Sequence, residues 1–152
     1  MAQYFFDTSA IVKYYHTELG TPKVSAIFAE AERKVRISSL GFLEIQSAFA
    51  MKVRSGILDR KAAGMQLARL MLDIAAGDIE VYGLTADHFL IAERLIGRHG
   101  FADRLRTLDA LQLAVALDLS DQRLVDQFVV ADKSLVSVAT SEGLSVLNPE
   151  TA

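Results

Sequence analysis

Four acidic residues lie in segments that can bring their carboxylates together, and carboxylates are the usual protein ligands of hard divalent cations. Asp7 follows a short apolar run in FFDTS, and Asp132 follows another in FVVAD. Glu44 and Asp109 lie in segments with helical spacing, SSLGFLEIQ and RTLDALQLA. An all-oxygen site suits Mg²⁺ or Mn²⁺ and offers little to zinc or copper. Such ions activate water and stabilise the leaving oxygen when a phosphodiester is hydrolysed.

Helix capping is the alternative explanation for three of these acids. Asp7, Asp109 and Asp132 each stand where an acidic side chain stabilises the first turn of a helix by about 0.3 to 1 kcal/mol. Glu44 is harder to explain in this way, because no basic residue lies three or four positions from it in the sequence. Carboxylates that crowd together without basic partners repel one another unless a cation neutralises them. The pattern therefore favours a metal site.

Five short apolar runs typical of strands alternate with segments of helical spacing. The predicted strands are residues 3–6, 35–38, 79–82, 127–131 and 144–147. The predicted helices are residues 8–16, 21–33, 40–54, 60–75, 86–99, 108–119 and 133–141. This alternation predicts an α/β fold with a parallel sheet and helices on both faces. Ligands bind such sheets beyond the carboxyl ends of the strands, where Asp7 and Asp132 are expected.

The composition indicates one compact domain spanning residues 1–152. The chain is 51% hydrophobic and has no linker, repeat or low-complexity segment. No apolar run approaches the roughly 20 residues that a membrane helix requires, and the N-terminus MAQYFFD lacks the features of a signal peptide. The absence of cysteine excludes disulfides and cysteine nucleophiles and agrees with a reducing compartment. We therefore expect a cytoplasmic protein with no membrane association.

Basic residues are unevenly distributed along the chain. The window from Arg33 to Lys61 holds seven basic and two acidic residues, although the whole chain has a net charge of -3. This asymmetry suits a protein with an acidic pocket and a separate basic surface, and equally suits ordinary solvated helices. The average charge argues against a protein that coats nucleic acid by bulk electrostatics.

Several other functional classes lack their residues here. His16, His88 and His99 do not have metal-ligand spacing, no P-loop is present, and no serine lies in a nucleophile elbow. An aspartyl phosphotransferase would need a second acid two residues after Asp7, where Ser9 stands. A response-regulator receiver domain, the best non-enzymatic alternative of similar fold, would need an acidic pair near the start and a lysine after the last strand.

Taken together, DTSAIVKYY, the S-S-L-x-x-x-E segment, LDALQLA, FVVAD and EGLSVLNP resemble the PIN domain family, and more narrowly its VapC-like toxins. The resemblance spans nearly the whole chain. It implies a three-layer α/β/α fold with a five-stranded parallel sheet in order 3-2-1-4-5. It also implies that Asp7, Glu44 and Asp109 are the principal catalytic metal ligands, that Asp132 is a fourth acid acting on the metal directly or through water, and that the hydroxyl of Ser9 supports the site. Relatives often carry threonine or serine two residues before the fourth acid, and this chain has Val130 there.

The same resemblance implies a magnesium- or manganese-dependent endoribonuclease, the toxin of a type II toxin-antitoxin pair. Its partners would be RNA, a small VapB-like antitoxin and a second copy in a homodimer. The residues we expect to contact RNA phosphates are Lys52, Arg54, Arg60 and Lys61. A catalytically silent PIN-like binding module is the alternative function, because Val130 lacks the hydroxyl that relatives often carry and is compatible with a site that need not catalyse a reaction.

Overall fold

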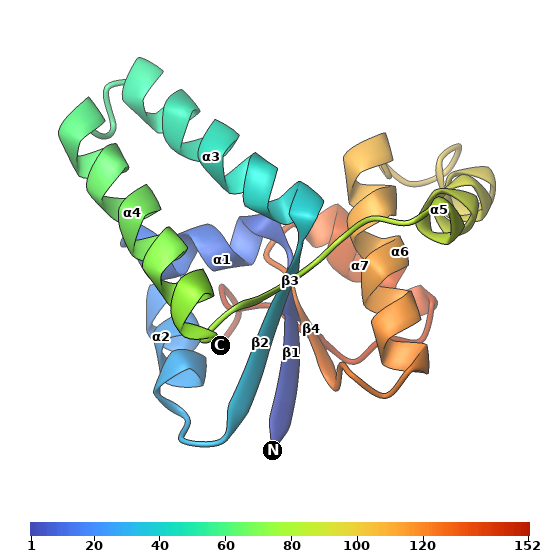
Figure 1. Ribbon diagram of the computed structural model, residues 1–152. Helices are drawn as coiled ribbons and strands as arrows, with labels where there is room; N and C mark the ends of the chain where they lie inside the picture. Colours follow the sequence, from blue (N-terminus) through green and yellow to red (C-terminus); the bar gives the residue numbers. More distant parts are fainter.

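A computed structural model describes residues 1–152 and contains one five-stranded parallel sheet (Figure 1). The strands are β1 (Ala2–Phe6), β2 (Arg33–Ser38), β3 (Glu80–Tyr82), β4 (Gln127–Val129) and β5 (Val146–Leu147). The helices are α1 (Thr8–Tyr15), α2 (Thr21–Ala29), α3 (Ser39–Arg54), α4 (Arg60–Ala76), α5 (Ala86–His99), α6 (Thr107–Asp121) and α7 (Lys133–Ser141). The strand order is β3-β2-β1-β4-β5, which confirms the predicted order.

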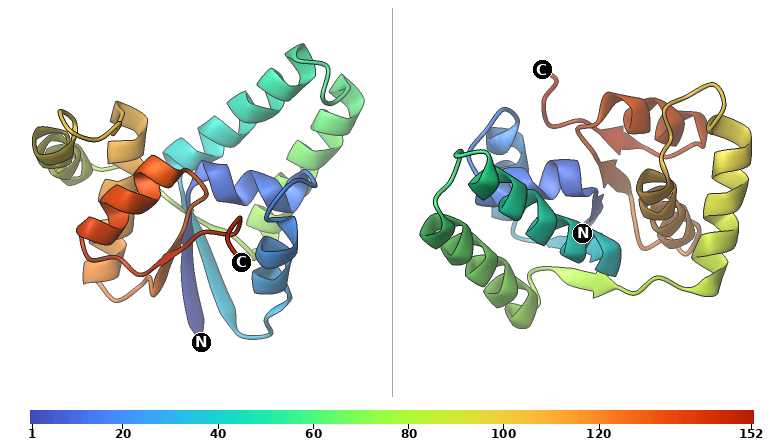
Figure 2. Two further views of the ribbon diagram at one scale, coloured as in Figure 1. Left: turned by 180° about the vertical axis from the view of Figure 1, so that it is seen from behind. Right: turned by 90° about the horizontal axis from the view of Figure 1, so that it is seen from above.

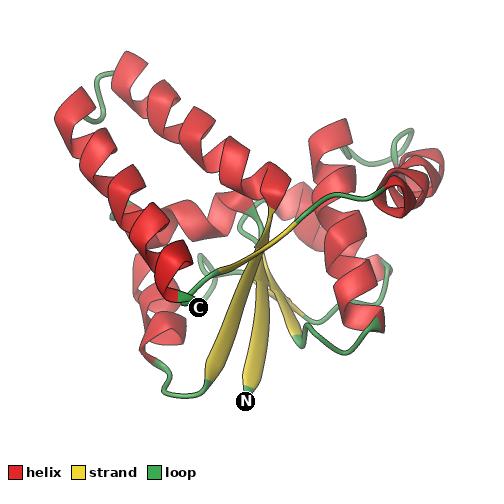
Figure 3. Ribbon diagram, in the orientation of Figure 1, coloured by secondary structure: helices red, strands yellow, loops and turns green.

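The helices cover both faces of the sheet and form the outer layers of an α/β/α fold (Figures 1 and 3). Successive strand residues point to opposite faces, so Phe6 packs with α1 to α4, whereas Phe5 packs with α5 to α7. Both phenylalanines are fully buried. The central strand is therefore apolar on both faces, as strands of parallel sheets usually are.

The carboxyl edge of the sheet is where four of the helices begin. Phe6 pairs with Val129 of β4, so the segments after β1 and β4 leave the sheet side by side. Helices α1, α3 and α7 follow their strands directly, and α6 also starts at this edge and runs back along the sheet (Figures 1 and 2). The α3–α4 hairpin extends from the same edge, away from α5 and α6 (Figure 2).

Element boundaries differ from the prediction where a backbone partner decides the conformation. The helix expected over 21–33 ends at Ala29, because Arg33 and Lys34 pair with Ala2 and Gln3 of β1. The last strand is shorter than expected, because the N–H of Leu144 donates to the carbonyl of Ala139 and completes the end of α7.

None of the helices is long and apolar enough to span a bilayer.

The buried face of α6 should dominate the stability of this half of the molecule. Leu113 of α6 is fully buried, whereas Leu72 of α4 is 70% exposed. Leu113→Ala should lower the free energy of unfolding by about 2 to 5 kcal/mol, because it leaves a cavity in the core. The same substitution at Leu72 should change it by less than about 0.5 kcal/mol. Urea denaturation of both variants measures the difference, and equal losses would contradict this packing.

Candidate metal centre

Asp7 lies at the carboxyl end of β1 and is 6% exposed. Its Oδ2 accepts hydrogen bonds from the N–H of Ser9 at 3.0 Å and from the hydroxyl of Ser9 at 2.6 Å, so the side chain caps α1. Burial raises the pKa of Asp7 to about 6 against the lowering effect of these hydrogen bonds, and the negative charges of Glu44 and Asp109 raise it further. Asp7 is therefore a buried acid with other acids near it.

Ser9 connects Asp7 to the segment after β4. While its hydroxyl donates to Asp7, its oxygen accepts the N–H of Ala131 at 3.0 Å and the N–H of Asp132 at 3.4 Å. Asp132 caps α7, because its Oδ1 accepts the N–H of Leu135 at 2.9 Å. One serine hydroxyl thus fixes the spacing of the first and fourth candidate ligands.

Glu44 is held by hydrogen bonds from neutral side chains. Its Oε1 accepts the hydroxyl of Thr8 at 3.1 Å and the amide of Gln112 at 3.0 Å. The carbonyl oxygen of the Gln112 side chain accepts the hydroxyl of Ser38 at 2.7 Å, and Gln112 is 1% exposed. A Cβ at Gly41 would come within 3.1 Å of the Gln112 amide nitrogen, so glycine there lets α3 and α6 approach closely.

Asp109 lies in the first turn of α6 and accepts the N–H of Arg106 at 3.3 Å. Burial raises the pKa of Asp109, Arg106 opposes that rise, and the charge of Asp132 adds to it. The Arg106 guanidinium is 3.7 Å from Oδ2 of Asp109 and 82% exposed, so this ion pair is weak. The charge interactions therefore link Asp7 to Glu44 and Asp109, and Asp109 to Asp132.

The four carboxylates share one pattern of contacts. Each has one oxygen held by protein hydrogen bonds, and the other oxygen accepts none. Arg106 is the only basic residue that forms an ion pair with any of the four. Oxygen donors without protein counter-charge are the ligand set that Mg²⁺ or Mn²⁺ prefers, so the donor chemistry fits such an ion.

The four acids nevertheless stand apart from one another. No three acidic, histidine or cysteine side chains lie close enough to ligate one ion in this arrangement. The sequence-based expectation of one closely gathered cluster is therefore not met in full. Mutual repulsion and the capping hydrogen bonds of Asp7, Asp109 and Asp132 account for the separation, because each cap holds its carboxylate toward its own helix.

The basic residues predicted to contact RNA lie at the tip of the α3–α4 hairpin, but they are not equivalent. Lys52 is 12% exposed at its side chain and forms an ion pair of 3.2 Å with Glu18. Arg54, Arg60 and Lys61 are exposed and form no ion pair. Of the basic window, Arg33, Lys34 and Arg36 also pair with acids, namely Asp78 and Glu80. The free positive charge of this surface is therefore smaller than the sequence indicates.

Two residues of the site were not singled out from the sequence. Thr8 and Gln112 orient Glu44, and Gln112 also contacts Ser38. A glutamine between Leu111 and Leu113 in an otherwise apolar run is the signal that could have identified it, because buried amides need partners. Val130, in contrast, is fully buried in the core beside α5 to α7 and contributes no polar group.

Comparisons with known proteins agree with this architecture. A family model described as PIN domain matches residues 4–141. No curated protein matches the sequence of the chain.

Solved structures resemble the fold at low sequence identity. The structure of VapC20 from Mycobacterium tuberculosis, described as a Sarcin-Ricin loop cleaving toxin, superposes with a TM-score of 0.67 at 18% identity, over 96% of this chain and 99% of that one. VapBC2 from Rickettsia felis, bound to a DNA fragment from its promoter, gives 0.63 at 14% identity, over 95% and 97%. A toxin-antitoxin complex from Klebsiella pneumoniae gives 0.62 at 15% identity, over 98% of each chain.

The raised pKa of Asp7 predicts a pH-dependent gain in stability on neutralising this side chain. Because the pKa rises from 3.8 to about 6 on folding, the folded chain holds the proton more tightly than the unfolded chain. The resulting stability is lost as the pH rises through the folded value. In chelator at neutral pH, Asp7→Asn should raise the free energy of unfolding by up to about 3 kcal/mol.

That gain should fade as the pH falls from about 6 and vanish below the ordinary carboxyl pKa of 3.8, where Asp7 is protonated in both states. The control is Asp121→Asn, at an exposed residue of α6 without an ion pair. Denaturation curves across pH measure both variants. A loss of stability in Asp7→Asn at neutral pH would contradict the account of this carboxylate.

The Gln112 amide should be important for stability as well as for the position of Glu44. Gln112→Leu removes the acceptor of the buried Ser38 hydroxyl and one of the two donors to the carboxylate of Glu44. We expect a loss of about 1 to 3 kcal/mol in unfolding free energy. Gln46→Leu, at an exposed position of α3, should change it by less than about 0.5 kcal/mol. Comparable losses from the two variants in urea denaturation would contradict the network.

Proposed function

This chain belongs to the PIN domain family, and we propose that it is a magnesium- or manganese-dependent endoribonuclease that acts as the toxin of a toxin-antitoxin pair. Asp7, Glu44, Asp109 and Asp132 are the proposed metal ligands, and Ser9 is a positioning residue. The proposal treats residues 1–152 as one domain.

The observation that carries the proposal is the uncompensated charge at the carboxyl edge of the sheet. Four carboxylates come to this edge from separate elements, and each keeps one oxygen free of protein hydrogen bonds. A purely capping role would not require Glu44, which lies in the second turn of α3 and caps nothing. A divalent cation would offset the burial and repulsion that raise the pKa of Asp7 and Asp109.

The residues around the four carboxylates would have separate roles in positioning them. Ser9 would fix the position of Asp7 relative to the segment that carries Asp132, and Thr8 and Gln112 would orient Glu44. Because each carboxylate is anchored through one oxygen, its other oxygen is the one that would ligate the ion. A bound divalent ion supplies an activated water and neutralises charge on the phosphodiester. No histidine is required as a general base.

The proposed partners follow from the family and from the solved structures that share the fold. VapC20 is described as a toxin that cleaves the Sarcin-Ricin loop, and the K. pneumoniae structure as a toxin-antitoxin complex. We therefore propose RNA as the substrate and a small VapB-like antitoxin as the partner. A homodimer is the proposed assembly.

The alternative is a catalytically silent binding module of the same family. Val130 favours this alternative, because no hydroxyl stands two residues before Asp132. Ser9 already supplies hydroxyl contacts to the backbone of Ala131 and Asp132, which favours the nuclease.

The test is cleavage of a mixed cellular RNA pool by the purified chain in magnesium, manganese or chelator. We expect cleavage with either ion and none in chelator. Asp7→Asn should lower the rate by at least about two orders of magnitude, because the metal contributes several kcal/mol to catalysis. Since this variant is expected to be more stable than the metal-free parent, unfolding would not explain the loss.

Asp121→Asn is the matched control and should retain full activity. Equal inactivity of the parent and Asp7→Asn, with magnesium still raising the melting temperature of the parent, would identify the silent module. Cleavage that continues in chelator would contradict the proposed chemistry.

A further inference from the structure

Two polar hollows lie beside the candidate metal ligands and share one arginine. One, of about 350 Å³, is lined by Glu44, Arg106, Thr107, Leu108 and Asp109. The other, of about 590 Å³, is lined by Gly100, Asp103, Arg104, Leu105, Arg106, Asp132 and Ser134. Arg106 lines both hollows, and their linings together include three of the four candidate ligands, Glu44, Asp109 and Asp132.

The two arginines that line these hollows, Arg104 and Arg106, are largely free of protein partners. Arg104 forms no ion pair or side-chain hydrogen bond and is exposed. Arg106 has only its weak contact of 3.7 Å with Asp109. Exposed guanidinium groups beside carboxylates that would bind a cation are well placed to hold the phosphates on either side of a scissile bond.

An aromatic residue on the same loop adds a second kind of contact. Phe101, between α5 and α6, is 96% exposed, the largest exposure of any large apolar side chain in the molecule. Proteins that bind single-stranded RNA combine a basic groove with exposed aromatic rings on which bases stack. The loop 100–106 carries two exposed arginines and one exposed aromatic ring within seven residues.

We propose that loop 100–106 is an RNA-binding element in which Arg104 and Arg106 hold two backbone phosphates and Phe101 stacks on a base. This inference rests on the proposed function and names a substrate-binding surface distinct from the α3–α4 tip. It places the RNA strand along the two hollows, past Asp132 and Asp109.

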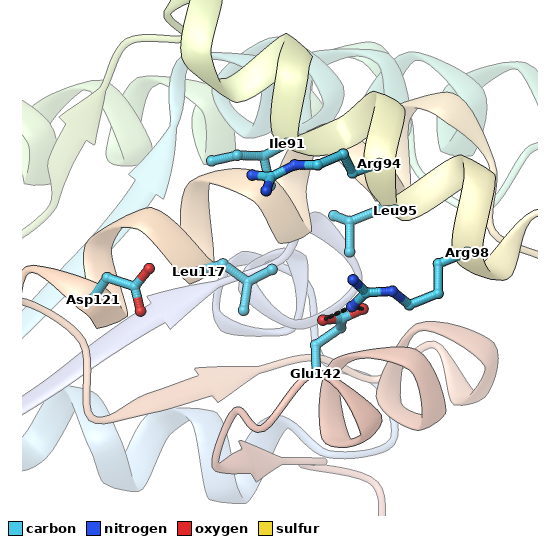
Figure 4. Close-up of a pocket in the computed structure, with 7 residues that line it drawn as sticks. All are labelled: Ile91, Arg94, Leu95, Arg98, Leu117, Asp121 and Glu142. Atoms are coloured by element: carbon cyan, nitrogen blue, oxygen red, sulfur yellow. Dashed lines mark hydrogen bonds and ion pairs between the residues drawn. The ribbon is translucent and has the colours of Figure 1, made fainter.

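A third hollow contains Arg94, the residue used as a matched control for the arginines of loop 100–106. It lies between α5, α6 and α7, has a volume of about 270 Å³, and is lined in part by Arg94, Arg98 and Asp121 (Figure 4). There Arg98 donates to Glu142 at 2.7 Å, whereas Arg94 forms no ion pair. Arg94 therefore matches Arg104 in charge and exposure but lies outside the proposed RNA path.

The experiment measures binding of a fluorescent single-stranded RNA to the full chain carrying Asp7→Asn, in chelator, over a range of salt concentrations. Each phosphate contact on a single strand contributes about 0.7 to the slope of log affinity against log salt. We expect Arg104→Gln and Arg106→Gln each to reduce the slope by about 0.7, and the double variant by about 1.4. Arg106→Lys should keep the slope, since the point charge remains.

Phe101→Ala should weaken binding at least about fivefold at every salt concentration while leaving the slope unchanged. Arg94→Gln should change neither quantity. Undetectable RNA binding, unchanged slopes in both arginine variants, or an equal change in Arg94→Gln would overturn the proposal. Because this assay measures binding and not cleavage, its failure can be told apart from failure of the proposed function. If the parent cleaves no RNA but the arginine variants reduce the slope, loop 100–106 binds RNA and only the proposed nuclease activity is contradicted.

Discussion

Negative charge that the protein itself does not neutralise is the constraint on which this architecture depends. Parallel strands deliver Asp7 and Asp132 to one edge, and helices α3 and α6 add Glu44 and Asp109. The nearest basic group, Arg106, is exposed and 3.7 Å from Asp109. The fold therefore carries a destabilising feature at the carboxyl edge of its sheet. Such features persist where function requires them, and an oxygen-ligated cation is the simplest use for this one.

Buried neutral polar groups hold that charge in place. Gln112, inside an otherwise apolar stretch of α6, joins Ser38 at the end of β2 to Glu44 and Thr8. Ser9 does the same between β1 and β4. Neither side chain brings a charge, so the carboxylates are oriented without being neutralised.

Apolar runs in the sequence marked the strands, and an acid directly follows two of them, so the sequence indicated that Asp7 and Asp132 lie at the carboxyl edge of the sheet. The sheet order came from the resemblance to the PIN domain family. The sequence was less informative about side chains whose contacts come from distant parts of the chain. Lys52 belongs to a basic window in the sequence, yet Glu18 from the α1–α2 connection pairs with it. Gln112 stands three positions after Asp109 in the sequence, and only the packing of α3 against α6 gives it Glu44 as a partner. The distances between carboxylates depend on side-chain torsions, which residue spacing does not determine.

Binding of Mn²⁺, followed by loss of the free-ion signal in electron paramagnetic resonance, tests the central claim most directly. The account predicts binding that Mg²⁺ competes away, that Asp7→Asn or Glu44→Gln greatly weakens, and that Asp121→Asn leaves intact. Equal Mn²⁺ binding by the parent and both site variants, or no binding by the parent, would contradict the claim that these carboxylates form a metal centre.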